Sequence, residues 1–219
     1  MIKGVIFDMD GVLVDNRDIH FRAFEIFCSR YGADGSSERL VPLFGMGNDD
    51  IMRTLMPPEV VQARGTAALS DEKEAIYRQI YEPVIEPVRG LREFLASLKE
   101  AGIRCAVGSS GCADNVRFVL EKCSIGQYFD ACISGDMVTR CKPDPEIYLT
   151  AAASLGLPAG ECLVFEDALA GIEAAERAGM HVTAVATTLP REVLEKRVGT
   201  ENVIDDFTQT NAARVAAIQ

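Results

Sequence analysis

The sequence of 219 residues contains no tryptophan, only two histidines and no long apolar run. A membrane-spanning helix needs about 20 consecutive, mostly apolar residues, so the absence of such a run argues against a membrane protein. The N-terminus also lacks the basic region and the apolar stretch of a signal peptide. We therefore expect a cytoplasmic protein.

The sequence contains fewer basic than acidic residues, with 22 Lys and Arg and 33 Asp and Glu, so its formal net charge is -11. This balance argues against nucleic acid and anionic lipid as partners. It does not exclude a phosphorylated small molecule, because the local charge of a pocket matters more than the total. An acidic surface that keeps the protein soluble is the simpler interpretation of the net charge. Nothing in the sequence predicts an obligate protein partner.

Paired cysteines are also missing. The seven cysteines are odd in number and contain no CxxC pair, so the sequence predicts neither a disulfide framework nor a zinc site. Cys105, Cys132 and Cys162 fall in apolar, strand-like runs. In such runs we expect cysteine to be a small buried hydrophobe.

Short apolar runs that alternate with amphipathic segments dominate the rest of the chain. The runs are typical of buried strands, and the segments between most of them repeat with the helical period of 3.6 residues. This alternation predicts an α/β fold with a parallel sheet and helices on both faces. The five expected strands are Ile2–Phe7, Arg104–Gly108, Ala131–Ser134, Cys162–Phe165 and Val182–Ala186.

One interval, from Asn16 to Glu86, breaks the alternation because it contains helical patterns and no convincing strand. It predicts an all-helical cap, residues 16–86, inserted after the first strand. Residues 1–15 and 87–219 would then form the core. A lid over the carboxyl edge of the sheet is the natural use of such an insertion, and extra helices packed on the core are the alternative.

Two acids, Asp8 and Asp10, follow the first strand. They are two residues apart, so their side chains leave the strand end on the same side. Carboxylates that close repel by roughly 4 kcal/mol at an effective dielectric constant of 20, which indicates a bound cation or a shared proton. Gly11 permits a sharp turn whose N–H groups can face an anion. A polar strand end that the acids merely cap is the alternative.

Polar residues follow three further strands. Ser109 precedes a helix, where a hydroxyl and free N–H groups can bind an anion. Pro143 keeps Lys142 out of helical geometry on a stiff loop, from which the ammonium can bind phosphate. Glu166 and Asp167 suit a hard cation. Each residue alone is explained as well by capping or by a solvated surface, but ligands of open α/β sheets bind at the carboxyl edge. Together the residues predict one site.

With these motifs in this order, the sequence resembles the haloacid dehalogenase superfamily, in particular its β-phosphoglucomutase-like phosphatases with a helical cap. The matching segments are residues 8–15 (DMDGVLVD), Ser109, Lys142-Pro143 and residues 166–172 (EDALAGI). The resemblance implies a Rossmann-like core, a cap inserted after the first strand and Mg²⁺ as cofactor.

The resemblance also implies a role for each motif. Asp8 would attack phosphorus and bind the metal. Asp10 would protonate the leaving oxygen, later activate water and touch the metal through its carbonyl group. Ser109 and Lys142 would hold the phosphoryl group. The metal ligands implied in this way are Asp8, Asp10, Glu166 and Asp167.

Within the expected cap, His20 and Lys73 match residues that β-phosphoglucomutases place near the substrate. His20 could equally be a helix-start or core residue. The mutases carry an arginine after a glycine-containing turn, where residues 45–50 of this chain read GMGNDD. Asn48 cannot supply a guanidinium fork to a second phosphate, which favours hydrolysis over mutase chemistry.

We therefore expect a Mg²⁺-dependent phosphoric monoester hydrolase that acts on a small phosphorylated metabolite, for example a sugar phosphate, through an aspartyl-phosphate intermediate. A sugar phosphomutase is the alternative. A non-catalytic phosphate-binding protein is disfavoured, because it has no need of the complete set of acids. A true dehalogenase is disfavoured because it needs neither the second acid nor the metal ligands.

Overall fold

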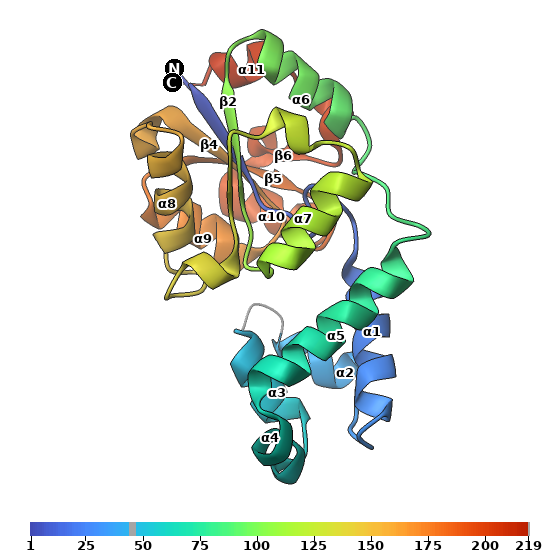
Figure 1. Ribbon diagram of the computed structural model, residues 1–219. Helices are drawn as coiled ribbons and strands as arrows, with labels where there is room; N and C mark the ends of the chain where they lie inside the picture. The colour runs from blue at the N-terminus through green and yellow to red at the C-terminus, as the bar shows by residue number, and fades with distance from the viewer. Residues whose placement is uncertain (44–46, 219) are drawn as a thin grey trace. The chain divides into compact units, whose positions relative to one another are not determined.

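The computed structural model describes residues 1–43 and 47–218. The chain divides into two compact units (Figure 1), which we describe one at a time. The core unit contains residues 1–15 and 86–219, and the helical unit contains residues 16–85. Within the described ranges, no helix has both the length and the apolar character that crossing a bilayer requires.

The core unit contains a six-stranded sheet in the order β3-β2-β1-β4-β5-β6, and every paired neighbour is parallel. The predicted α/β class is confirmed, and each of the five expected runs overlaps a strand, with bounds that differ by one or two residues at some ends. The sixth strand has two residues, too few to show a period. The strands are β1 (Gly4–Phe7), β2 (Arg104–Gly108), β3 (Ala131–Ile133), β4 (Cys162–Glu166), β5 (His181–Val185) and β6 (Val203–Ile204).

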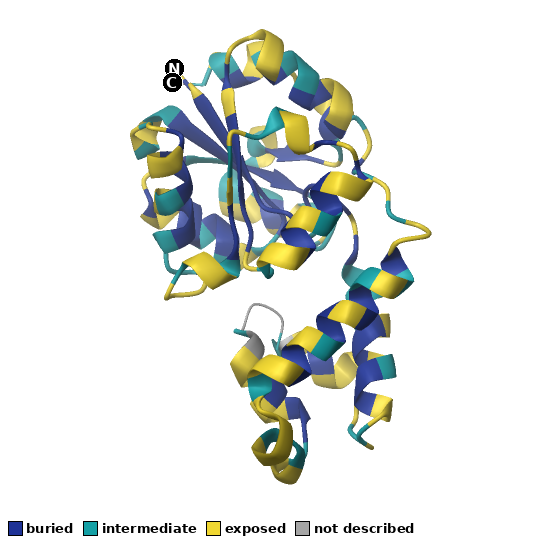
Figure 2. Cartoon of the chain, viewed as in Figure 1, coloured by how far each residue is buried: buried dark blue, intermediate teal, exposed yellow. Residues whose placement is uncertain are grey.

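Helices cover both faces of this sheet (Figure 1). Successive residues of β1 point to opposite faces. Ile6 packs among residues of α8 and α9, whereas Phe7 contacts the rings of Phe94 and Phe207 on the other face. Buried residues are concentrated along the strands (Figure 2). The helices are α6 (Leu91–Glu100), α7 (Ala113–Lys122), α8 (Glu146–Ser154), α9 (Leu169–Arg177), α10 (Arg191–Val198) and α11 (Ala212–Ala216).

The prediction that all three strand cysteines are buried is wrong for Cys132. Cys105 and Cys162 lie on inner strands and are buried, whereas Cys132 is exposed. The reason is that β3 is the edge strand of the sheet. Its Ile133 is covered by the α8 side of the core, but Cys132 points to the opposite face, where the helix layer leaves it open.

The helical unit consists of helices throughout its described part. Glu72 of α5 pairs with Arg30, at the end of α1, and with Arg64 of α4. Phe24 and Cys28 lie on the buried face of α1. The helices are α1 (Arg17–Ser29), α2 (Ser37–Leu40), α3 (Asn48–Leu55), α4 (Pro58–Arg64) and α5 (Thr66–Tyr81), with a 3-10 turn η1 (Val41–Leu43).

The strand order determines where a ligand of the core unit is expected. Chain connections reverse direction between β1 and β4, the two central strands. In open α/β sheets, ligands bind outside the carboxyl ends of the strands at this reversal. Asp8 follows β1, and Glu166 ends β4. The fold therefore brings two of the predicted site residues to the expected place.

Candidate active site

The centre of the site is a lysine held between two acids. Lys142 Nζ lies 2.6 Å from Asp8 Oδ1 and 2.6 Å from Glu166 Oε1. Asp8 extends its strand by one residue, since its N–H donates to the Phe165 carbonyl oxygen at 3.0 Å. Asp8 and Glu166 are buried, being 7% and 1% exposed. Residues 134 positions apart are thus joined by charge in a site that is largely shielded from solvent.

Each carboxylate oxygen of Glu166 accepts two hydrogen bonds. Oε1 accepts from Lys142 at 2.6 Å and from the hydroxyl of Tyr148 at 2.7 Å. Oε2 accepts from the backbone N–H groups of Asp167 at 2.9 Å and Ala168 at 3.0 Å. A carboxylate offers about four lone-pair positions, so none remains for a further ligand. The ring of Tyr148 also lies 4.7 Å from Lys142 Nζ.

Asp167 brings a third carboxylate to the cluster. One oxygen from each of Asp8, Glu166 and Asp167 lies within 4.8 Å of the others. Gly11 makes this approach possible, because a Cβ atom there would overlap the Asp167 carboxylate. Gly11 also has a φ of +76°, which side-chain-bearing residues rarely adopt. Three carboxylates facing one lysine leave two negative charges uncompensated.

Burial and this excess of negative charge together shift the pKa values of the three acids. Burial, assisted by the charges of Glu166 and Asp10, raises the pKa of Asp8 to about 7 in spite of Lys142. Burial and the charges of Glu166 and Asp8 raise the pKa of Asp167 well above its ordinary range. Burial acts on Glu166 too, but the charge and hydrogen bond of Lys142 outweigh it and lower that pKa. The negative charge is therefore held on Glu166, while Asp8 and Asp167 favour the protonated form in the absence of a cation.

The predicted hydroxyl of the site, Ser109, follows β2. Its N–H donates to the Ile133 carbonyl oxygen at 3.0 Å, and its buried Oγ accepts from the Gly111 N–H at 3.0 Å. Asp10 faces the same loop, since its Oδ2 lies 3.8 Å from the position that a Cβ of Gly111 would take. The N-terminus of α7 has fewer free N–H groups for an anion than the sequence predicts, because the Ala113 N–H already donates to Asp136 at 2.7 Å.

His20 and Lys73 lie together in the helical unit. Lys73 Nζ is 2.8 Å from His20 Nδ1 and 2.9 Å from Glu74 Oε1, and Lys73 is buried. The His20 ring stacks on Tyr77 with centroids 4.1 Å apart. Of the turn compared with the mutases, Gly45, Met46 and the side chain of Asn48 lie outside the described residues.

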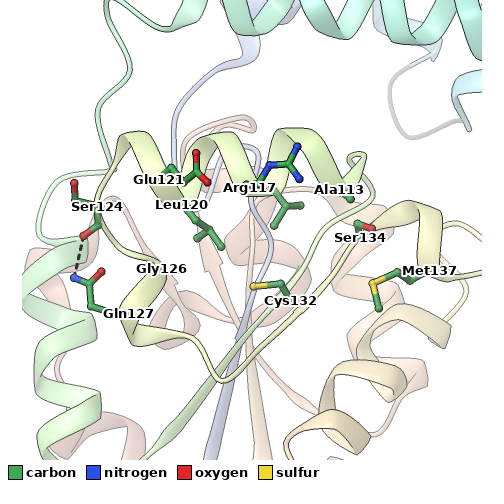
Figure 3. A pocket seen from close by; sticks show the side chains of 11 residues that line it. Ala113, Arg117, Leu120, Glu121, Ser124, Gly126, Gln127, Cys132, Ser134 and Met137 are labelled. Carbon is green, nitrogen blue, oxygen red and sulfur yellow. Dashed lines mark hydrogen bonds between the residues drawn. The ribbon is translucent and has the colours of Figure 1, made fainter.

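A separate cavity of about 560 Å³ lies in the core unit beside α7 (Figure 3). Cys132 and Ser134 of the β3 edge, Leu120 of α7 and Met137 contribute to its lining. The lining contains none of Asp8, Lys142, Glu166 and Asp167, which we call the acid cluster. The cavity therefore offers no nucleophile paired with a lysine, and the cluster is the better candidate for chemistry.

Gly171→Ala is expected to destabilise the protein by about 1 to 3 kcal/mol, the usual cost of overpacking. Alanine normally stabilises a helix interior relative to glycine by about 1 kcal/mol. In α9, however, a Cβ at Gly171 would overlap the carboxylate of Glu166. Urea unfolding measures the change. Gly160→Ala is the control, because a Cβ there meets nothing within 4 Å. Equal stability of the two variants would contradict the expected clash.

The sequence motifs missed three residues of this site. Tyr148 reads as one member of the apolar stripe of α8, and no signal separates it from the core. Thr187 and Thr188 follow β5. Thr187 Oγ1 donates to the Gly11 carbonyl oxygen, and the Thr188 side chain hydrogen-bonds to Asp167. Polar residues directly after an apolar strand were the signal at the other strand ends and could have revealed the threonines.

Comparison with known proteins agrees with this architecture. A phosphorylated carbohydrates phosphatase from Thermotoga maritima is 30% identical over 182 residues, which are 82% of each chain. The solved structure of CbbY from Rhodobacter sphaeroides in complex with phosphate is 26% identical, has a TM-score of 0.86, and is matched over 99% of this chain and 100% of that one.

A plant protein, SUPPRESSOR OF QUENCHING 1, chloroplastic, from Arabidopsis thaliana, is 33% identical over 211 residues. The match covers 94% of this chain but only 20% of that protein. The model of the haloacid dehalogenase-like hydrolases matches residues 5–185. Since this match covers well over half of the sequence, the chain belongs to the haloacid dehalogenase-like hydrolase family.

Proposed function

We propose that the protein is a phosphatase that hydrolyses small phosphorylated metabolites, sugar phosphates in particular, with Asp8 as nucleophile. The observation that carries this proposal is the buried Asp8 carboxylate with one oxygen bonded to Lys142 at 2.6 Å. Its other oxygen is left for phosphorus or a cation. The phosphorylated carbohydrates phosphatase among the relatives supports the substrate class.

The acid cluster fits Mg²⁺ as cofactor. Mg²⁺ prefers oxygen ligands and is usually held by one or two carboxylates together with substrate phosphate. Burial, together with the charges of neighbouring carboxylates, raises the pKa values of Asp8 and Asp167, and a divalent cation would supply positive charge to both. When bound, it would stabilise the negative charge of the phosphoryl oxygens. We propose Asp8, Asp167 and the carbonyl group of Asp10 as its ligands.

Glu166 acts differently in this proposal. Its four accepted hydrogen bonds leave no lone pair for a metal. Since two of the donors are Lys142 and Tyr148, Glu166 holds the lysine beside Asp8. We therefore assign Glu166 to positioning rather than to direct metal ligation.

The reaction would follow a double displacement. Asp8 attacks phosphorus, so a bond forms between its carboxylate oxygen and phosphorus while the bond to the ester oxygen breaks. Asp10 gives its proton to the departing alcohol. Asp10 then accepts a proton from the water molecule that attacks the aspartyl phosphate, which releases inorganic phosphate and restores Asp8. Ser109 and Lys142 hold the phosphoryl oxygens throughout. We propose that the helical unit, with His20 and Lys73, contributes to substrate selection.

The direct test is phosphate release from a panel of sugar phosphates with Mg²⁺, with the Asp8→Asn variant as the blank. We expect release from several compounds by the unmodified protein and none above background from the variant. Conversion of a sugar 1-phosphate into its 6-phosphate without free phosphate would show a mutase instead. No release from any compound beyond the level of the blank would refute the phosphatase.

Magnesium is expected to raise the melting temperature more at about pH 8 than at about pH 5.5. The pKa of Asp8 is raised from its ordinary 3.8 to about 7, and that of Asp167 is raised too. The metal-free folded state therefore binds protons that the unfolded chain has already lost, and its stability falls as the pH rises between these values. The lowered pKa of Glu166 changes the stability at pH values below its ordinary pKa of 4.5, and the raised pKa of Lys142 changes it above the ordinary 10.5. Both ranges lie outside the two pH values compared.

Thermal unfolding in EDTA and in Mg²⁺ at the two pH values measures this difference, with NaCl of matched ionic strength as the control. At the higher pH the cation meets two ionised carboxylates, whereas at the lower pH it must displace protons from them. A gain in melting temperature that is the same at both pH values would contradict the proton competition.

A further inference from the structure

Two threonines that follow β5 reach the acid cluster. In the sheet order, β5 lies on one side of the central strands β1 and β4, whereas β3, which precedes Lys142, lies on the other side. The Thr188 side chain hydrogen-bonds to the carboxylate of Asp167. Thr187 Oγ1 donates to the carbonyl oxygen of Gly11. One dipeptide thus holds both the turn after β1 and the acid after β4. The sequence motifs predict no role for either threonine.

Gly11 shows how closely these groups converge. A Cβ at Gly11 would overlap Asp167 and would lie 2.8 Å from Thr188 Oγ1. The Asp167 carboxylate therefore lies over the bare face of the turn, with the Thr188 hydroxyl beside it. Thr187 anchors the same turn from its carbonyl side.

Asp167 needs such an anchor because its neighbours repel it. Carboxylate oxygens of Asp8 and Glu166 lie within 4.8 Å of one of its own. The charge of Lys142 offsets this repulsion only in part, because its ion pairs are with Asp8 and Glu166. A hydroxyl donor occupies one lone pair, fixes the orientation of the carboxylate and leaves its remaining lone pairs for a cation.

We propose that Thr188 is a positioning residue that holds the Asp167 carboxylate toward Asp8 in the orientation required to bind a divalent cation, with Thr187 fixing the Gly11 turn beneath it. This inference rests on the proposed function. Hydrogen-bond partners that orient a metal ligand typically account for about 10-fold to 100-fold of metal affinity. The threonine pair acts on Asp167 and Gly11, and neither threonine touches phosphorus.

Calorimetric titration of the metal-free protein with Mg²⁺ alone tests the proposal without any substrate. Thr188→Val keeps the shape of the side chain but removes the donor, and we expect its affinity for Mg²⁺ to fall about 10-fold to 100-fold. Thr188→Ser restores the hydroxyl and should bind within about 3-fold of the unmodified protein. The control is Thr183→Val, which removes a buried threonine hydroxyl from β5, the strand that precedes Thr187 and Thr188.

The melting temperature of each variant confirms that it is folded, and Thr188→Ala replaces Thr188→Val if the latter does not fold. Mg²⁺ affinity of the hydroxyl-free variant equal to that of the unmodified protein would overturn the role of Thr188. An affinity lost equally in Thr188→Ser would overturn it as well, since the donor is then not the cause.

The same titration separates this inference from the proposed function. If the unmodified protein binds Mg²⁺ and releases phosphate while Thr188→Val binds equally well, the role of Thr188 fails and the phosphatase stands. If the unmodified protein neither binds Mg²⁺ nor releases phosphate, the proposed function fails and takes the inference with it.

Discussion

Replacing Asp8 with asparagine is expected to lower phosphate release on the order of 10⁴-fold or more while leaving the protein folded. Asparagine has nearly the same shape and its carbonyl oxygen can still accept the bond from Lys142, but an amide is not a nucleophile toward phosphorus. The loss of turnover would therefore come from chemistry. Phosphate release at saturating substrate, with Mg²⁺ present, measures it.

Stability should move in the opposite direction to activity. The pKa of Asp8 is raised to about 7, chiefly by burial, so at pH 8 the folded state must keep a carboxylate ionised at a cost that the unfolded chain does not bear. The neutral amide removes this cost. We expect the metal-free Asp8→Asn variant to melt a few degrees higher than the unmodified protein, given that about 1 kcal/mol shifts a domain of this size by about 2 to 4 °C.

Asp71→Asn is the matched control, because Asp71 is exposed on α5 in the helical unit and should change neither property. Substantial phosphate release by Asp8→Asn would remove Asp8 as the nucleophile. A lower melting temperature of the metal-free variant would mean that the carboxylate stabilises the fold, contrary to its raised pKa.

The sheet and the position of the site can be predicted from patterns in the sequence. The apolar runs that end at Phe7 and at Phe165 lie in buried strands, and parallel strands bring their carboxyl ends to one edge. Asp8 and Asp167 therefore meet for a reason that needs no coordinates. By contrast, β6 has only two residues, and the exposure of Cys132 depends on which strand is at the edge.

The direction of each side chain could not be read from the sequence. Neighbouring residues of a strand face opposite ways, so Glu166 and Asp167 cannot both be assigned to one ion from their spacing. The structure resolves the difference through partners: Glu166 is filled by four donors, and Asp167 turns toward Gly11. Tyr148 is one of those donors and is hidden in a helical stripe that periodicity interprets as core. The sequence pattern predicts which side chains lie at the same edge of the sheet. The contacts made in the folded protein determine which of them can bind a metal ion and which only position a neighbour.

Lys142→Met is expected to abolish phosphate release and to destabilise the protein by about 3 to 5 kcal/mol, the usual cost of removing one partner from a buried ion pair. Lys142 is the cation shared by Asp8 and Glu166 at 2.6 Å from each. Asp8 can take up a proton, since its pKa is already about 7. Glu166 is held ionised by Lys142 and by three other donors, so it would be left as a buried, uncompensated charge.

This explanation predicts a partial rescue. Glu166→Gln in the Lys142→Met background removes the stranded charge and keeps an acceptor for the Tyr148 hydroxyl. We expect it to recover about 1 to 3 kcal/mol of the lost stability, the size of the coupling usual for residues in contact. Phosphate release should stay absent, because the group that holds the phosphoryl oxygens is still missing. Urea unfolding of the two single variants and the double variant completes the cycle.

Lys3→Met gives the matched control, since Lys3 pairs with Glu161 on the surface at 2.9 Å and exposed pairs contribute about 1 kcal/mol at most. If Lys142→Met costs no more than Lys3→Met, the cluster is not held by a buried charge pair. If the double variant is as unstable as Lys142→Met alone, Glu166 is not the charge that the lysine neutralises. Recovery of stability without activity would instead separate the two tasks of Lys142, which are neutralising Glu166 in the folded protein and holding the phosphoryl group in the reaction.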